Sequence, residues 1–239
     1  MIKRIINKIL SLIFGKSYIQ KKIKKESIRK LHSYGDEVIQ KLLEVEKITG
    51  VKFDLSFGTL LGAYRDHGFI PHDDDVDVIM KIEYLSEDLI KTLREFGFVI
   101  DSIFVSSDYI GCQLPMTYKG LTCDIYITYT IDNNYHTFVP HPIYDMDWNF
   151  CGKINIYRSR DIIIPYFDNR VLCKFNGYEL LIPDNSHEIL AHTYGEDFMV
   201  PKKGVITKVD ETSLSCKYFS AFPLNVALDE GILEKLRRC

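Results

Sequence analysis

The sequence predicts a mixed α/β fold of the α+β kind, with one mixed β-sheet flanked by helices. Segments with helical periodicity (residues 26–49, 86–96 and 185–193) are separated by short segments rich in β-branched and aromatic residues, of which residues 121–129 are the clearest. The chain has no internal repeat and no low-complexity linker. Its 239 residues suit one well-packed domain with a small appendage.

The first half of the predicted order alternates helices and strands. A helix over residues 26–49 ends at Gly50 and leads to a strand over residues 51–57. A turn at Gly58 and a short helix over residues 59–64 follow, and then a strand over residues 76–80. The next helix, residues 86–96, is capped by Ser86 and ended by Gly97.

The second half is predicted to be richer in strands. Candidate strands cover residues 98–100, 103–105, 110–114 and 121–129, and a hairpin turns at Asn176-Gly177 between residues 171–175 and 178–182. Residues 135–160 show no clear periodicity. We expect a catalytic domain over residues 26–205 and, from 206 to 239, a tail that packs on it.

The N-terminal segment, residues 1–25, is basic and amphipathic. Isoleucines and leucines recur at helical spacing over the first 14 residues, too few to span a bilayer. Residues 1–30 hold ten Lys/Arg and one acid, which leaves 20 basic and 32 acidic residues, so the two parts carry net charges of +9 and −12. Residues 1–14 therefore suit an anionic membrane surface, or alternatively packing on the protein itself or a partner subunit.

The acidic body and the cysteines exclude other classes of function. A net charge of −12 argues against nucleic acid as the main substrate. The six cysteines form no CxxC pair and no zinc pattern, so they indicate free thiols in a reducing, cytoplasmic compartment.

Two aspartates, one just before and one within the strand over residues 76–80, are the first candidates for chemistry. Alternation in a strand puts Asp75 and Asp77 on one face and the valines between them on the other. Two such carboxylates repel each other unless a cation lies between them, and Mg²⁺ suits this arrangement. Asp73 and Asp74 are equally well explained as a solvated acidic loop.

Asp124 is the candidate for a third carboxylate. It is the one acid within an otherwise apolar predicted strand, where an unpaired charge would be costly. It could hold a metal or act as general base; the alternative is a structural acid with local hydrogen bonds.

Three residues near the predicted short helix are candidates for phosphate binding. Gly58 and Thr59 lie where a strand leads into a helix, where backbone N–H groups can approach a phosphate. Arg65 is a candidate phosphate clamp, with an ion pair to Asp66 as the alternative.

These residues together resemble the signature of a known family. Gly-Thr-Leu-Leu-Gly-Ala-Tyr-Arg over residues 58–65 and Phe-Ile-Pro-His-Asp-Asp-Asp-Val-Asp-Val over residues 69–78 are similar to the motif of the LicD family, which includes bacterial phosphocholine transferases and is similar to fukutin and fukutin-related protein. Residues 123–126 and the block from 182 to 201 extend the resemblance, to about residues 30–205. His72 stands where the family usually has Trp; it is interpreted as an exposed loop residue or as a titratable group beside the metal.

The resemblance implies a nucleotidyltransferase-like fold and transfer of a phospho-substituent from a CDP-activated donor, such as CDP-choline, to a sugar hydroxyl of a glycan or glycolipid. Asp75 and Asp77 would bind Mg²⁺, or Mn²⁺ in its place, and Asp124 would take the acceptor proton or hold a second metal. Gly58, Thr59, Arg65 and His72 would contact the substrates. The alternatives are a nucleotidyltransferase that releases pyrophosphate and a non-catalytic nucleotide- or glycan-binding relative.

A long aromatic stretch offers candidates for the acceptor site. Its polar members are His136, His141, Asp145, Asp147 and Trp148, which are otherwise ordinary loop and core residues. The inferred location is the cytoplasm, peripheral at the inner face of the membrane.

Overall fold

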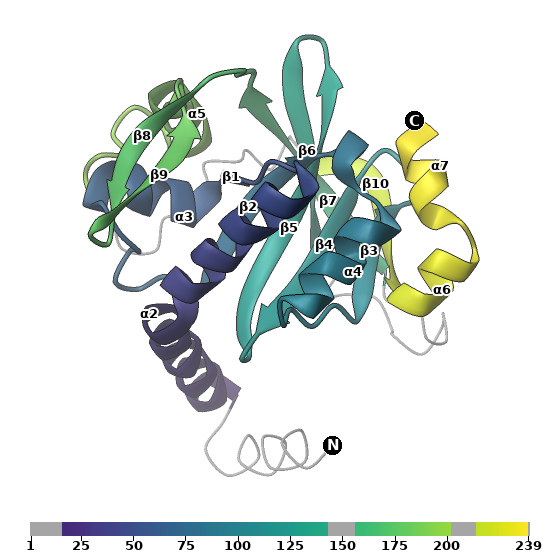
Figure 1. Cartoon of the computed structure of the whole chain (residues 1–239), viewed down its shortest axis with the longest axis horizontal. Helices are drawn as coiled ribbons and strands as arrows, with labels where there is room; N and C mark the ends of the chain where they lie inside the picture. Colours follow the sequence, from purple (N-terminus) through teal and green to yellow (C-terminus); the bar gives the residue numbers. More distant parts are fainter. Residues whose placement is uncertain (1–15, 143–155, 202–213, 239) are drawn as a thin grey trace.

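The computed structural model describes residues 16–142, 156–201 and 214–238 (Figure 1). The helices in these ranges are α2 (Lys16–Thr49), α3 (Phe57–Leu61), α4 (Glu87–Glu95), α5 (Ser186–Tyr194), α6 (Leu224–Asp229) and α7 (Ile232–Arg238), with a π-helical turn η1 (Gly62–Asp66) and a 3₁₀ turn η2 (Ile82–Tyr84). The strands are β1 (Asp54–Leu55), β2 (Asp75–Lys81), β3 (Ser102–Ser106), β4 (Cys112–Tyr118), β5 (Leu121–Ile131), β6 (Asn134–Pro142), β7 (Ile156–Pro165), β8 (Arg170–Phe175), β9 (Tyr178–Pro183) and β10 (Leu214–Pro223).

The described strands form one large sheet and one hairpin. The sheet has the order β1-β2-β5-β4-β3-β10-β7-β6, and β6 also pairs with β5. This extra pairing closes the strands from β5 round to β6 into a ring, from which β2 and β1 extend. The β2–β5 pair is parallel, and the other pairs in the sheet are antiparallel. The sheet is therefore mixed, as the sequence predicts.

Helices α2 and α4 lie on one face of this sheet (Figure 1). Leu31, Val38 and Val45 of α2 lie at helical spacing and are fully buried. Helix α4 begins where the Ser86 side chain accepts a hydrogen bond from the backbone N–H of Leu89 (3.2 Å). The predicted cap at Ser86 is confirmed, and α2 packs on β2 and β5, the strands that carry the site.

Two predicted strands are wrong in extent. The strand expected over residues 51–57 is reduced to β1, because the chain turns at Phe57 (φ 45°) directly into α3. The Asp54 carboxylate is buried, and it forms a bidentate ion pair with Arg170. Residues 98–100 form only an isolated bridge, at Val99 opposite Thr117.

The segments without a clear sequence pattern form the remaining strands of the ring. Residues 135–160 include most of β6 and the start of β7, where Tyr135, Thr137 and Phe138 are all buried, so no alternation marks the strand. The segment after residue 205, predicted as a tail packed on the domain, supplies β10, a strand inside the sheet between β3 and β7.

The N-terminal prediction stays open. Residues 1–14 lie outside the described residues, and α2 extends ten residues further toward the N-terminus than the predicted helix over 26–49. Among the described helices, none combines the length and the apolar character needed to cross a bilayer.

Candidate active site

Parallel pairing of β2 with β5 brings the three predicted carboxylates together. Asp77 is the register partner of Asp124, and Asp75 lies two residues before Asp77 on the same face of the sheet. One carboxylate oxygen from each of Asp75, Asp77 and Asp124 lies within 4.8 Å of the other two. Asp75 and Asp77, which strand alternation places on one face, therefore lie beside Asp124 on that same face.

Asp77 is buried, and Asp75 and Asp124 are partly buried beside it, an arrangement that isolated charges tolerate poorly. Burial, followed by the charges of Asp73, Asp74 and Asp124, raises the pKa of Asp75 to about 7. Burial, followed by the charges of Asp75, Asp124, Asp73 and Asp74, raises the pKa of Asp77 well above its ordinary value. The pKa of Asp124 is raised by burial to about 6, against a hydrogen bond from Gln113 that lowers it.

Two buried oxygen atoms in this cluster have no hydrogen-bond partner, Oδ1 of Asp77 and Oδ1 of Asp124. Buried polar atoms are normally satisfied, so these two indicate a missing ligand. A divalent cation such as Mg²⁺ takes carboxylate oxygens and would offset the mutual repulsion. The residues present fit such an ion.

Asp73 belongs to the site as well, although the sequence pattern is equally typical of a solvated loop. Asp73, Asp74 and Asp75 form a second close group of carboxylates. Oδ2 of Asp73 is buried without a partner, and burial raises the pKa of this carboxyl group. The indication in the sequence that Asp73 belongs to the site was the run of acids directly before a buried strand.

Gly58 and Thr59 hold this arrangement from the side of α3. A Cβ atom on Gly58 would lie 2.4 Å from Oδ2 of Asp73, so only glycine leaves room for that carboxylate. Thr59 is buried, and its hydroxyl oxygen accepts a hydrogen bond from the backbone N–H of Asp77 (3.0 Å). Both residues position the acids; their predicted contact with a phosphate stays a prediction.

The positions of Arg65 and His72 agree with the alternative interpretations given for them, an ion pair with Asp66 for Arg65 and an exposed loop position for His72. The Arg65 guanidinium forms a bidentate pair with Asp66 (2.7 and 2.9 Å) and donates to the carbonyl of Phe198 (3.3 Å). His72 is exposed in the turn before Asp73. Substrate contact by either residue remains untested.

Three further residues adjoin the acids and were not predicted. Tyr126, two residues after Asp124 on the same face, has its pKa raised by burial and by the charges of Asp77, Asp124 and Asp75, and its ring lies edge-on to Phe57 at 5.0 Å. Tyr194, at the end of α5, has its pKa raised by burial and by the charges of Asp77, Asp73 and Asp75. Gln113 reaches Asp124 from β4. Alternation could have indicated Tyr126; Gln113 depends on the register of β4 against β5, and Tyr194 on contacts distant in the chain.

The predicted acceptor stretch is described only in part. His136 on β6 pairs with Asp161 on β7 (3.1 Å). The side chain of His141 and the residues Asp145, Asp147 and Trp148 lie outside what the structure describes.

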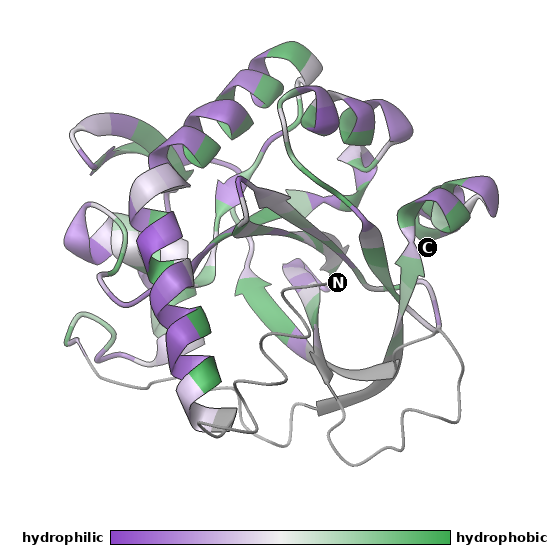
Figure 2. Ribbon diagram, turned by 90° about the horizontal axis from the view of Figure 1, so that it is seen from below, coloured by the Kyte–Doolittle hydropathy of each residue, from purple (hydrophilic) through white to green (hydrophobic). Residues whose placement is uncertain are grey.

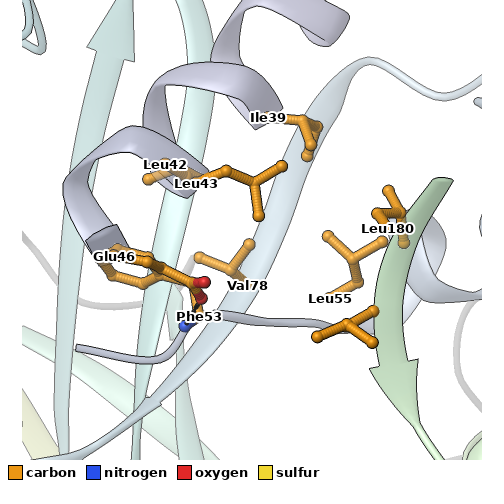
Figure 3. A pocket seen from close by; sticks show the side chains of 9 residues that line it. Ile39, Leu42, Leu43, Glu46, Phe53, Leu55, Val78 and Leu180 are labelled. Atoms are coloured by element: carbon orange, nitrogen blue, oxygen red, sulfur yellow. Dashed lines mark hydrogen bonds between the residues drawn. The ribbon is translucent and has the colours of Figure 1, made fainter. Parts of the chain in front are cut away.

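An apolar pocket on the other face of β2 is separate from the acids. Its walls come from α2, β2 and β9, with Glu46 as its one charged member (Figure 3). Val78 lines this pocket, and Val78 points away from the face that carries Asp77. The pocket therefore belongs to the packing of α2 and not to the carboxylate site.

Comparison with known proteins agrees with the geometry. The family model described as LicD/FKTN/FKRP, nucleotidyltransferase domain, matches residues 50–185, more than half of the chain. The chain belongs to the LicD family. The matched residues include every acid of the site and Gly58, Thr59, Arg65 and His72.

LicD-family relatives are distant in sequence. The chain is 25% identical over 169 residues to ribitol-5-phosphate transferase FKTN of Mus musculus, which covers 70% of this chain and 33% of the relative. The Homo sapiens protein of the same name is 24% identical over 169 residues, with the same coverage. An uncharacterised protein of Rickettsia prowazekii is 26% identical over 122 residues, 47% of this chain and 45% of the relative. The chain thus spans about a third of the length of the FKTN relatives, and the family includes transferases of phosphate-containing groups.

Proposed function

We propose that this protein is a metal-dependent phosphotransferase that moves a phospho-substituent from a CDP-activated donor to a sugar hydroxyl and releases CMP. The observation that carries the proposal is the set of three carboxylates, one buried and two partly buried, on adjacent parallel strands, with two oxygens lacking partners. The acceptor is a cell-surface glycan, such as lipopolysaccharide or teichoic acid, or its lipid-linked precursor.

Phosphocholine is the first transferred group to test, because the motif over residues 58–78 resembles that of the phosphocholine transferases. Phosphoribitol is the second, because the FKTN relatives are ribitol-5-phosphate transferases. The same acids serve either group, since they act on the diphosphate and not on the alcohol that it carries.

Asp75, Asp77 and Asp124 are the residues that would hold Mg²⁺ or Mn²⁺. When bound, the ion supplies positive charge that offsets the charge developing on the donor phosphates. Asp124 is the base: its carboxylate takes the proton of the acceptor hydroxyl as the new P–O bond forms and the P–O bond to CMP breaks. In the metal-free protein burial raises the pKa of Asp124 to about 6, so its carboxylate is ionised at neutral pH and able to accept a proton.

The proposed location is the cytoplasmic face of a membrane. The net charge of +9 over residues 1–30 supports attraction to anionic lipid, with residues 1–14 as the contact. Flotation with phosphatidylglycerol vesicles tests this: full-length protein should float and protein lacking residues 1–15 should not. Equal flotation of both forms would contradict the membrane contact.

The activity is tested by a screen of CDP-choline, CDP-ethanolamine, CDP-ribitol and CDP-glycerol with Mg²⁺, in which CMP release is measured. Asp75→Asn and Asp77→Asn should each lower turnover by at least about a hundredfold, because each removes a metal ligand. Asp101→Asn, at an exposed acid outside the site, is the matched control. Turnover at the wild-type rate in both site variants would refute the metal site, and pyrophosphate release from CTP would point to a nucleotidyltransferase instead.

A further inference from the structure

Lys24 lies on the side of α2 that faces the acidic segment before β2. Lys24, Leu31 and Val38 are spaced seven residues apart, so they form one stripe along the helix. Leu31 and Val38 are fully buried against the body. Lys24 lies on the same stripe, two helical turns N-terminal to Leu31. There the apolar contacts of α2 end, and the helix lies beside the acidic segment before β2.

Lys24 reaches the edge of the carboxylate site. Its Nζ atom lies 4.0 Å from Oδ1 of Asp74, and its side chain is 59% exposed. Its charge also lowers the pKa of Asp75 and of Asp73 against the larger effects that raise them. The amine is therefore close to the site and still open to solvent.

Three other basic groups among the described residues are engaged or directed elsewhere. Arg65 is bound by Asp66 and the carbonyl of Phe198. Lys30 donates to the carbonyl of Gly120 (2.9 Å) and pairs with Glu26. Lys22, two residues before Lys24, points about 160° away around the helix axis and is exposed. Figure 2 shows this first half of α2 as largely hydrophilic, with hydrophobic residues at intervals.

The site needs positive charge when a donor arrives. Four acids lie within residues 73–77, and Asp124 adds a fifth. A donor diphosphate brings further negative charge, more than one divalent cation offsets. An exposed pair such as Lys24–Asp74 is weak, and a lysine has three N–H donors on a flexible stem, so the amine can exchange a carboxylate for a phosphate.

We propose that Lys24 of α2 binds a phosphate oxygen of the metal-bound donor, in place of its contact with Asp74. The inference rests on the proposed function for the identity of the donor. It assigns a substrate contact to a helix that precedes the part of the chain matched by the LicD family model, residues 50–185.

Kinetics with the active CDP donor test the contact. Lys24→Ala should raise the KM for the donor about tenfold, because it removes one charge-assisted phosphate contact. The KM for the acceptor should stay unchanged, and Lys24→Arg, which keeps the charge, should recover most of the loss. Lys22→Ala is the matched control on the other side of the helix and should leave the donor KM unchanged.

Calorimetry with inorganic pyrophosphate and Mg²⁺ gives a second readout that needs no nucleoside and no turnover. Wild type and Lys22→Ala should bind it alike, and Lys24→Ala about tenfold more weakly. Equal binding and equal donor KM in Lys24→Ala and wild type would overturn the inference. So would an equal loss in Lys22→Ala, which would indicate general attraction by α2.

The two proposals fail in different ways. If no CDP donor is turned over but Lys24→Ala weakens pyrophosphate binding, the proposed function is wrong and the contact stands. If wild-type protein turns over the donor and Lys24→Ala does so with the same KM, the contact is wrong and the function stands. Equal thermal midpoints for Lys24→Ala and Lys22→Ala show that the effect is not a loss of fold.

Discussion

The carboxylates of the site are brought together by small, uncharged neighbours. Gly58 lacks the one atom that would collide with Asp73, and the hydroxyl of Thr59 fixes the backbone at Asp77. The glycine is required for space, since its φ is not in the left-handed region. Gly58 and Thr59 of α3 thus hold the like charges close together from one side. We expect the cation to bind on the side of the carboxylates that faces away from α3.

Gly58→Ala should destabilise the protein by about 1 to 3 kcal/mol, because the new methyl group overlaps Oδ2 of Asp73. The double variant Gly58→Ala/Asp73→Ala should recover most of this loss, since the carboxylate is then gone. Urea unfolding of wild type, both single variants and the double variant measures the coupling. Additive effects would show that the two residues do not meet.

Metal-free protein should lose stability as the pH rises. The pKa of Asp124 is about 6 in the folded protein and near 4 when unfolded, so the folded state binds the proton more tightly. Its contribution is fully present below pH 4 and is lost as the pH rises through 6, and Asp75 extends the loss to about pH 7. For Asp124 alone the change is about 2 to 3 kcal/mol.

Urea unfolding in EDTA at pH 5.5 and pH 8 measures this dependence. Between pH 5.5 and pH 8, the free energy of unfolding should fall more for wild type and Asp101→Asn than for Asp124→Asn. Mg²⁺ should raise the free energy of unfolding of wild type most at pH 8. Parallel behaviour of Asp124→Asn and wild type would mean that the acid is not buried as described.

At the scale of elements, the β8–β9 hairpin is tied to the rest of the molecule by polar contacts. Arg170 at the start of β8 forms its bidentate pair with the buried Asp54 of β1. At the other end, Asn176 and Tyr178 both donate to Oδ1 of Asp36 on α2 (2.8 and 3.1 Å). These contacts fix the hairpin beside β1 and α2, away from the acids of β2 and β5.

Arg170→Leu should therefore cost about 3 kcal/mol, because it leaves the Asp54 carboxylate buried without its counter-ion. The double variant Asp54→Leu/Arg170→Leu should regain much of that stability, since no buried charge remains. Thermal unfolding measures both, and Mg²⁺ binding by the folded variants should match wild type. A double variant no more stable than Arg170→Leu would mean that the pair itself, and not the orphaned charge, sets the cost.

Across the whole molecule, the sequence predicts what depends on local pattern. Strand alternation selects Asp75 and Asp77, and the apolar strand around Asp124 marks the third acid before any pairing is known. The contact of Gln113 with Asp124 depends on the register of β4 against β5, which the turn at Lys119-Gly120 sets and which the predicted strands over residues 110–114 and 121–129 did not give. Strand β6 escapes prediction because burial on both faces removes alternation, as at Tyr135, Thr137 and Phe138. Strand β10 escapes prediction because its partners, β3 and β7, are distant in the chain.

The place of β10 gives the last prediction. A protein ending at residue 205 retains every residue of the site and all of the family match, yet it lacks the strand that pairs with both β3 and β7. It also loses the buried side chains of Phe219, Leu224 and Leu236. Two unpaired strand edges and an open core favour aggregation.

We expect the truncated protein to be insoluble or to unfold without a cooperative transition, as measured by calorimetry against the full chain. A soluble fragment with a sharp transition that binds Mg²⁺ would show that the ring closed by β10 is dispensable and that the folding unit ends near residue 205.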